Sequence, residues 1–209
     1  IKGVIWYQGE SNAHNYEAHE KLFRLLVGSW RENWNDPDLP FYYVQLSSID
    51  RPSWPWFRDS QRRLMDAISH TGMAVSSDYG DSLDVHPKNK RPIGERLAHW
   101  ALNRTYDKKQ VVPSGPLFRS VDFREDAAYV SFDYADGLHT ADGRPIREFE
   151  IAETEGVYYP AKAEVVGNQV KVYSDRVKHP HHVRYAWRPF TRANLVNSQG
   201  LPASTFRSR

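Results

Sequence analysis

The first 105 residues alternate short apolar segments with amphipathic ones, and this alternation constrains the fold more than any other feature of the chain. In chain order the pattern predicts a strand at 3–7, a helix at 16–34, a strand at 41–46, a helix at 57–69, a strand at 73–77 and a helix that ends near Arg104. Parallel strands need crossover connections, which such helices provide. We therefore expect an α/β fold in which helices flank a parallel sheet.

Two of these predicted helices carry an apolar stripe that indicates their buried face. The stripes consist of Leu22, Leu25, Leu26 and Trp30 in the first helix and of Leu64, Met65 and Ile68 in the second. The loops 8–12, 47–56 and 78–86 each follow a predicted strand. They should meet at the carboxyl edge of the sheet, where functional groups of such folds gather.

After Tyr106 the helical periodicity ends and short alternating segments take its place, which are typical of antiparallel strands. These segments lie at 128–132, 149–152, 163–166, 170–173 and 183–187. Gly167-Asn168 between two of them predicts a tight hairpin turn. The chain thus divides into an α/β part at 1–105 and a β-rich antiparallel part at 106–209, whose tail at 194–209 should pack back across a neighbouring surface.

Composition narrows the function classes. Aromatic residues make up 13% of the chain, which suits a carbohydrate-facing surface but also a large core. The net charge of +2 is dispersed without a basic run, so nucleic acid is not the expected partner. There are no cysteines, hence neither disulfides nor a thiolate metal site, and no apolar run approaches a membrane span of roughly 18 residues.

The chain opens within a predicted strand, with no initiator methionine before Ile1. Because natural chains seldom begin inside a core strand, we expect it to be the C-terminal portion of a longer protein. The missing part of the sheet would leave apolar surface exposed, which predicts self-association or association with the missing N-terminal part. An extracytoplasmic location is expected over a cytoplasmic one.

His86 is the leading candidate for a catalytic base. Asp84 stands two residues before it and Asp81 is close by, in a loop that follows a predicted strand. A carboxylate next to an imidazole fixes which nitrogen carries the proton and stabilises the imidazolium. Asp84 is the first choice of orienting acid and Asp81 the second. The alternative is a structural loop histidine that caps the following helix.

The segment Gln8-Gly9-Glu10-Ser11-Asn12 leaves three interpretations open from its residues alone. Ser11 is a possible nucleophile. Gly9 allows a backbone N–H to approach a developing oxyanion, with Gln8 or Asn12 as additional amide donors. The segment can also be a turn that ends in an ordinary helix cap, a position for which serine and asparagine are preferred.

Other residues carry weaker predictions. Arg51, Trp54 and Trp56 lie on the expected 47–56 loop, where tryptophan can stack on a sugar and arginine can pair with a carboxylate, although ordinary loop packing explains them too. The run 179–182, His-Pro-His-His, lacks a partner motif for a metal, and we interpret it as structural. The acidic side chains at 148, 150, 153 and 155 are typical of a solvated strand face rather than a glycosidase pair.

Four separated motifs give the chain a family resemblance. They are the segment 3–12, Asp84-Val85-His86-Pro87, Ser114-Gly115-Pro116 and the tail motif made of 194–197 and 200–203. In this order, and across essentially the whole chain, they resemble the sialate O-acetylesterases, which are serine esterases of the SGNH hydrolase group. The resemblance implies part of an SGNH-type, flavodoxin-like three-layer α/β/α sheet, followed by a β-rich accessory region.

The resemblance also assigns roles. In that family the nucleophile belongs to an upstream Gly-Gln-Ser-Asn-Met motif, and this chain contains no Gly-Gln-Ser, which implies that Ser11 is not the nucleophile. Gln8, Gly9 and Glu10 match the oxyanion and support block, and His86 matches the general base. The wider SGNH group has aspartate three residues before the histidine, where this chain has Leu83, so Asp84 departs from that spacing.

The resemblance therefore predicts half of a serine-esterase site, the half without the serine. The expected reaction is hydrolysis of sugar O-acetyl esters, with sialic acids as the family's namesake substrate and with no metal or cofactor. One alternative is a carbohydrate-binding or structural module without catalysis, suggested by the aromatic residues and the β-rich half. A second alternative is a self-contained esterase that uses Ser11.

Overall fold

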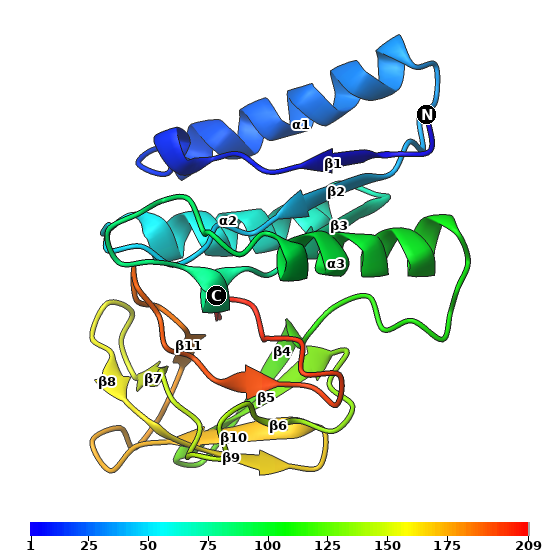
Figure 1. The fold of residues 1–209 in the computed structure, drawn as a ribbon. Coiled ribbons are helices and arrows are strands. Elements are labelled where there is room, and N and C mark those ends of the chain that lie inside the picture. Colours follow the sequence, from blue (N-terminus) through cyan, green and yellow to red (C-terminus); the bar gives the residue numbers. More distant parts are fainter. Residues whose placement is uncertain (209) are drawn as a thin grey trace.

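The computed structural model describes residues 1–208, which form an α/β part stacked on a β-rich part (Figure 1). The α/β part runs β1 (Val4–Trp6), η1 (Glu10–Asn12), α1 (Tyr16–Asn33), β2 (Phe41–Val44), α2 (Trp54–Ala67), β3 (Thr71–Ala74), η2 (Ser77–Tyr79), α3 (Arg91–Trp100) and the π-helical turn η3 (Ala101–Thr105). The predicted order of strands and helices is confirmed.

Strands β1, β2 and β3 form a parallel sheet in that spatial order, as the alternation predicts. Alternate residues of β2 point to opposite faces of the sheet. Phe41 and Tyr43 meet Phe23 of α1, with ring centroids 5.6 Å and 5.0 Å apart, whereas Tyr42 stacks on Trp100 of α3 at 6.4 Å. Helices thus cover both faces of the sheet, with α1 and α2 packed together on one of them.

Helix α1 begins at Tyr16 because the side chain of Asn15 accepts the N–H of Ala18 at 3.1 Å and caps the first turn. Its buried residues are His19, Phe23 and Val27, which repeat every four positions. The predicted stripe is wrong for Leu22 and Leu25, which are 57% and 69% exposed. The contact with Phe41 and Tyr43 turns the helix so that Phe23 faces the sheet.

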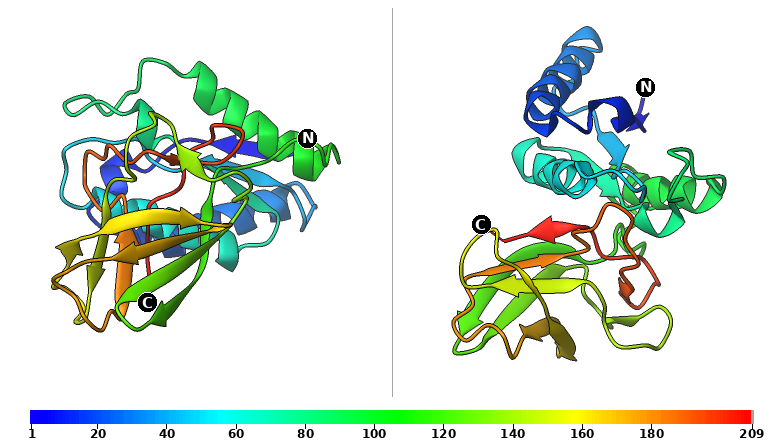
Figure 2. Two further views of the ribbon diagram at one scale, coloured as in Figure 1. Left: turned by 90° about the horizontal axis from the view of Figure 1, so that it is seen from below. Right: turned by 90° about the vertical axis from the view of Figure 1, so that its left-hand side faces the viewer.

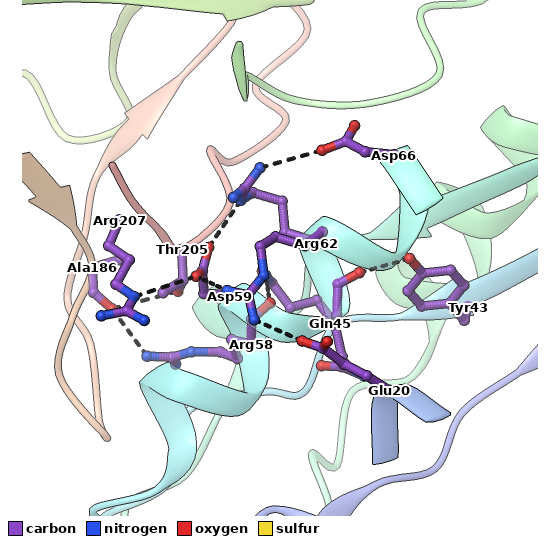
Figure 3. Close-up of polar contacts among 12 residues, drawn as sticks. Glu20, Tyr43, Gln45, Arg58, Asp59, Arg62, Asp66, Ala186, Thr205 and Arg207 are labelled. Carbon is purple, nitrogen blue, oxygen red and sulfur yellow. Dashed lines mark hydrogen bonds and ion pairs between the residues drawn. The ribbon is translucent and has the colours of Figure 1, made fainter. Parts of the chain in front are cut away.

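Helix α2 begins at Trp54 rather than at Phe57, so the predicted 47–56 loop is shorter than expected. Pro55 stands in the first turn, where its missing N–H has no helical partner to lose. The helix is unusual because its buried face is largely polar and includes Arg58, Asp59 and Arg62. This polar face lies against the C-terminal strand that carries Arg207 (Figure 3).

The β-rich part consists of antiparallel sheets, as predicted (Figure 2). One sheet has the order β4-β5-β10-β9, made of Leu117–Arg124, Ala127–Asp133, Gln169–Tyr173 and Lys162–Val166. A second has the order β13-β11-β7-β8, made of Phe206–Arg207, His182–Tyr185, Phe149–Ala152 and Tyr159–Pro160. The pair β12-β6 joins Leu195–Val196 to His139–Thr140.

The predicted hairpin turn is confirmed, since Gly167 has a φ of +61° between β9 and β10. Strand β4 was not predicted. Its register with β5 shifts between Phe118 and Ser120, and such a bulge breaks the alternation by which a strand is detected. The tail packs back as expected: Phe206 is fully buried and stacks on Phe118 at a centroid distance of 4.4 Å.

Candidate active site

Three loops meet at the carboxyl edge of the parallel sheet, as the strand order requires. The backbone N–H of Asp50, after β2, donates to the carbonyl of Ser82, after β3, at 3.2 Å. The Lys90 ammonium lies 5.0 Å from the centroid of the Tyr7 ring, at the end of β1. Val85 packs against the apolar cluster that also contacts Tyr7. These contacts bring the segment after β1 and the Asp84–His86 loop to one place.

The loop between β3 and α3 is fixed where it leaves the sheet. The guanidinium of Arg96 on α3 pairs with both carboxylate oxygens of Asp78, at 2.7 Å and 2.6 Å, and also donates to the carbonyl of Val75 at 2.7 Å. Sequence reasoning missed Arg96. The sequence does carry a sign of this role: Arg96 is a charged residue on the apolar stripe of a helix, beside Ile93 and Leu97. An arginine at such a position needs buried partners.

The His86 ring lies beside the Asp84 carboxylate. Oδ1 of Asp84 lies 3.3 Å from Nδ1 of His86 and accepts the backbone N–H of His86 at 2.9 Å. That N–H holds the pKa of the Asp84 carboxyl below its usual value, so the carboxylate is ionised at neutral pH. Nδ1 is therefore the ring nitrogen that lies next to the Asp84 carboxylate.

Asp81, the second choice of orienting acid, has a different role in the structure. Its Oδ1 accepts the backbone N–H groups of Leu83 at 2.8 Å and Asp84 at 3.2 Å, and these bonds shape the turn. Leu83, three residues before His86, is 91% exposed. Of the two aspartates, Asp84 is therefore the one that contacts the His86 ring.

The His86 imidazole is 80% exposed and borders a hollow of about 300 Å³. The hollow is lined by residues 78–81, by Asp84 and by 86–89. Two larger hollows, of about 430 Å³ and 560 Å³, lie near Pro40 and His70 and between α2 and β4, away from His86. The side chains rather than the volume therefore single out this hollow, because His86 and Asp84 both line it.

Gly9 cannot be replaced without strain. Its φ is +146°, and a Cβ on it would lie 2.6 Å from the Phe57 ring. The Gly9 carbonyl accepts the N–H of Asn12 at 2.9 Å and so opens the turn η1, and the Gln8 amide donates to Oδ1 of Asn12 at 2.6 Å. Gln8 and Asn12 thus hold each other, while Glu10 is half-buried at the start of η1.

The helix-cap interpretation of Ser11 and Asn12 is wrong, because the cap of α1 is Asn15. Ser11 lies in η1 with its side chain exposed. Within residues 1–208, Ser11 and His86 share no hydrogen bond.

The three residues predicted to contact a sugar differ in how far they are exposed to solvent. Trp54 is 1% exposed and its Nε1 donates to the carbonyl of Ser47 at 2.6 Å, so its ring has no open face and the prediction for it is wrong. Trp56 is 36% exposed and lies edge-on to Trp187 at a centroid distance of 5.2 Å. Arg51 is exposed, with its guanidinium 5.5 Å from the Trp54 ring. For Arg51 and Trp56 the role stays a prediction.

In the described part of the chain, residues 1–208, histidine, aspartate and glutamate side chains form no group of three that could hold a metal ion, and the 179–182 run is no exception. Over the same residues, none of the helices has both the length and the apolar composition needed to cross a membrane.

Comparison with known proteins finds relatives of this chain among the acetylesterases. Residues 1–103 match the model of a carbohydrate esterase family described as sialic acid-specific acetylesterase. The matched residues make up just under half of the 209-residue chain. The sialate O-acetylesterase of Rattus norvegicus is 25% identical over 100% of this chain, which covers 44% of the rat protein. That of Homo sapiens is 27% identical over 99% of this chain, covering 45% of the human protein. The chain thus spans about half the length of these acetylesterases.

A solved structure extends the likeness to the acetylesterases from sequence to fold. The crystal structure of a novel carbohydrate acetylesterase from Xanthomonas citri superposes with a TM-score of 0.94 and is 36% identical. The match covers 100% of this chain and 50% of the solved one. The α/β part and the β-rich part are therefore arranged relative to each other in the same way in both proteins.

Proposed function

We propose that this chain supplies the general base of a serine esterase that removes O-acetyl groups from sugars. The observation that carries the proposal is the Asp84–His86 pair, with Nδ1 toward the carboxylate and the ring open to a hollow, on a fold similar to that of a carbohydrate acetylesterase. The names of the relatives favour acetylated carbohydrates, including sialic acids, as the substrate class. The finer fold proposal is that β1, β2 and β3 are part of an SGNH-type three-layer sheet.

Apart from the nucleophile, we assign the steps of ester hydrolysis to groups at this edge of the sheet. Nε2 of His86 would take the proton from a serine hydroxyl as its oxygen attacks the acetyl carbonyl. Asp84 would stabilise the imidazolium, and N–H donors around Gly9 would stabilise the tetrahedral oxyanion. The imidazolium then protonates the departing sugar oxygen. Water, deprotonated by His86 in turn, releases acetate from the acyl-serine.

The nucleophile in this proposal is a serine outside these 209 residues. The chain has no Gly-Gln-Ser motif, and Ser11 makes no hydrogen bond to His86 within residues 1–208. The rival is Ser11 itself, which lies on the loop after β1 at the same edge of the sheet.

The test compares His86→Ala with Ser11→Ala in whichever form hydrolyses p-nitrophenyl acetate, the 209-residue chain or the natural protein that contains it. Removal of a general base should lower kcat about 10²- to 10⁴-fold, whereas Ser11→Ala should leave kcat within about twofold. His139→Ala, an exposed histidine on β6, is the matched control. Equal activity in the His86 variant and the control would refute the esterase proposal, and loss of activity in Ser11→Ala would make Ser11 the nucleophile.

A further inference from the structure

Ser48 joins three segments that are far apart in the sequence. It follows β2, its side chain is fully buried, and its hydroxyl donates to the carbonyl of Ser77 at 2.8 Å. The same oxygen accepts Nη1 of Arg58 at 3.2 Å and the backbone N–H of Thr191 at 3.3 Å. The hydroxyl thus uses its one donor and both of its acceptor sites. It donates to the loop after β3, and it accepts from α2 and from the β-rich part.

Arg58 continues the connection into the β-rich part. It is fully buried on α2, and its Nη2 donates to the carbonyl of Ala186 at 3.0 Å (Figure 3). The same nitrogen also donates to the carbonyl of Arg188. Nη1 also reaches the carbonyl of Pro189 at 3.4 Å. Burial lowers the pKa of Arg58 to about 9, so the guanidinium is still charged at neutral pH. Charge-assisted bonds to several carbonyls fix the segment 186–191 on α2.

The segment that Ser48 holds leads directly to His86. Ser77 begins η2, and Gly80 follows so close to Ser48 that a Cβ on Gly80 would lie 2.2 Å from the Ser48 carbonyl oxygen. Two residues further, the carbonyl of Ser82 accepts the N–H of Asp50. The loop is thus fixed against the Ser48 segment up to two residues before Asp84, while the His86 ring itself is exposed.

We propose that Ser48 and Arg58 are positioning residues for the Asp84–His86 loop, through which the β-rich part holds the general base in place. This inference rests on the proposed role of His86. A buried arginine with only carbonyl and hydroxyl partners is a poor way to gain stability, because an apolar residue of similar volume often serves as well. The hydrogen bonds of Arg58 are directional, however, and they hold α2 and the segment 186–191 in one relative position. A small displacement of a catalytic base lowers the rate steeply, so such a brace has a functional consequence.

The chain offers a matched pair of variants to test this role. Ser48 and Ser60 are both fully buried, but in residues 1–208 the Ser60 hydroxyl has no hydrogen-bond partner. Ser48→Ala and Ser60→Ala therefore remove the same atom from equally buried sites, and only the first breaks the connection to Ser77. Arg58→Lys is a third variant that keeps the charge and loses the forked donors.

The measurements are amide hydrogen exchange of residues 77–86 and the steady-state constants for p-nitrophenyl acetate, below the unfolding transition of each variant. Ser48→Ala should raise exchange in 77–86 about tenfold and lower kcat about tenfold or more, with KM within about twofold. Arg58→Lys should change both in the same direction. Ser60→Ala should leave both within about twofold.

The outcomes separate this inference from the proposed function. A loss of kcat in Ser48→Ala together with faster exchange in 77–86 supports the positioning role. Unchanged kcat in folded Ser48→Ala, whatever happens to its melting temperature, overturns it and leaves only a structural role. His86→Ala, measured in the same form of the protein, decides the esterase proposal independently: if it is inactive while Ser48→Ala is not, only the positioning role fails.

Discussion

At the scale of single residues, the site depends on backbone positions that few side chains can occupy. Gly9 and Gly80 both lie where a Cβ would overlap a neighbour, the Phe57 ring in one case and the Ser48 backbone in the other. Both glycines follow strands that end at the site. Glycine is required at both positions for a steric reason, because only a residue without a side chain lets each loop pack this closely on its neighbour.

Gly9→Ala should destabilise the protein by about 1–3 kcal/mol, because it adds both an overlap with Phe57 and a strained positive φ. Urea denaturation measures the free energy of unfolding. Gly28→Ala and Gly94→Ala are controls in α1 and α3, where nothing lies within 4 Å of the added Cβ, and they should stabilise by about 0.5–1 kcal/mol. Equal effects at the three positions would show that the Gly9 environment is not constrained.

At the scale of elements, the packing of α1 on α2 contains a buried histidine. His19 of α1 is 6% exposed, and its ring lies 4.4 Å from that of Phe57 on α2 and 5.6 Å from that of Phe23. Burial lowers the pKa of His19 to about 4. The helix pair is thus built around a neutral imidazole, used here as an aromatic side chain.

This burial makes stability depend on pH. The folded pKa of His19 lies below the ordinary value of 6.5, so the unfolded chain binds a proton first, and stability falls as pH decreases from about 6.5 to about 4. The loss from this group should be about 2–3 kcal/mol. Urea denaturation at pH 7 and pH 4.5 measures it. His19→Phe should make the change in the free energy of unfolding between pH 7 and pH 4.5 smaller than in the wild type. The exposed-site control His139→Gln should leave this change as in the wild type. A change of wild-type size in His19→Phe would contradict the assignment.

At the scale of the whole molecule, β1 and α1 expose apolar surface. Within residues 1–208, β1 pairs with β2 alone, so one edge of this parallel strand is unpaired. Ile5 lies on the face of the sheet against which α3 packs, but α3 leaves Ile5 uncovered, and its side chain is 69% exposed. Leu22 and Leu25 on α1 are exposed as well. An open strand edge with apolar neighbours favours association.

We expect the isolated 209-residue chain to cover this surface with a second copy of itself, one of the two associations that the sequence predicts. Sedimentation velocity at several concentrations should show a monomer–dimer equilibrium, and Ile5→Glu should shift it toward monomer about tenfold by placing a charge in the contact. Val157→Glu, at a residue 51% exposed in the β-rich part, is the control and should leave the equilibrium unchanged. A concentration-independent monomer would count against this expectation.

The sequence by itself determined the order of elements and which loops lie at one edge of the sheet. Periodicity is a local property, so the strand and helix alternation and the Asp84-Val85-His86 spacing are visible without a structure. Only the tertiary structure decided that Asp84 rather than Asp81 contacts the His86 ring, that Trp54 is buried and that α2 begins three residues early. It also supplied the Ser48–Arg58 connection, because Arg58 meets Ala186 across 128 positions of sequence. A sequence pattern indicates which face of a helix is buried; it does not name the distant carbonyl that a buried arginine will bind.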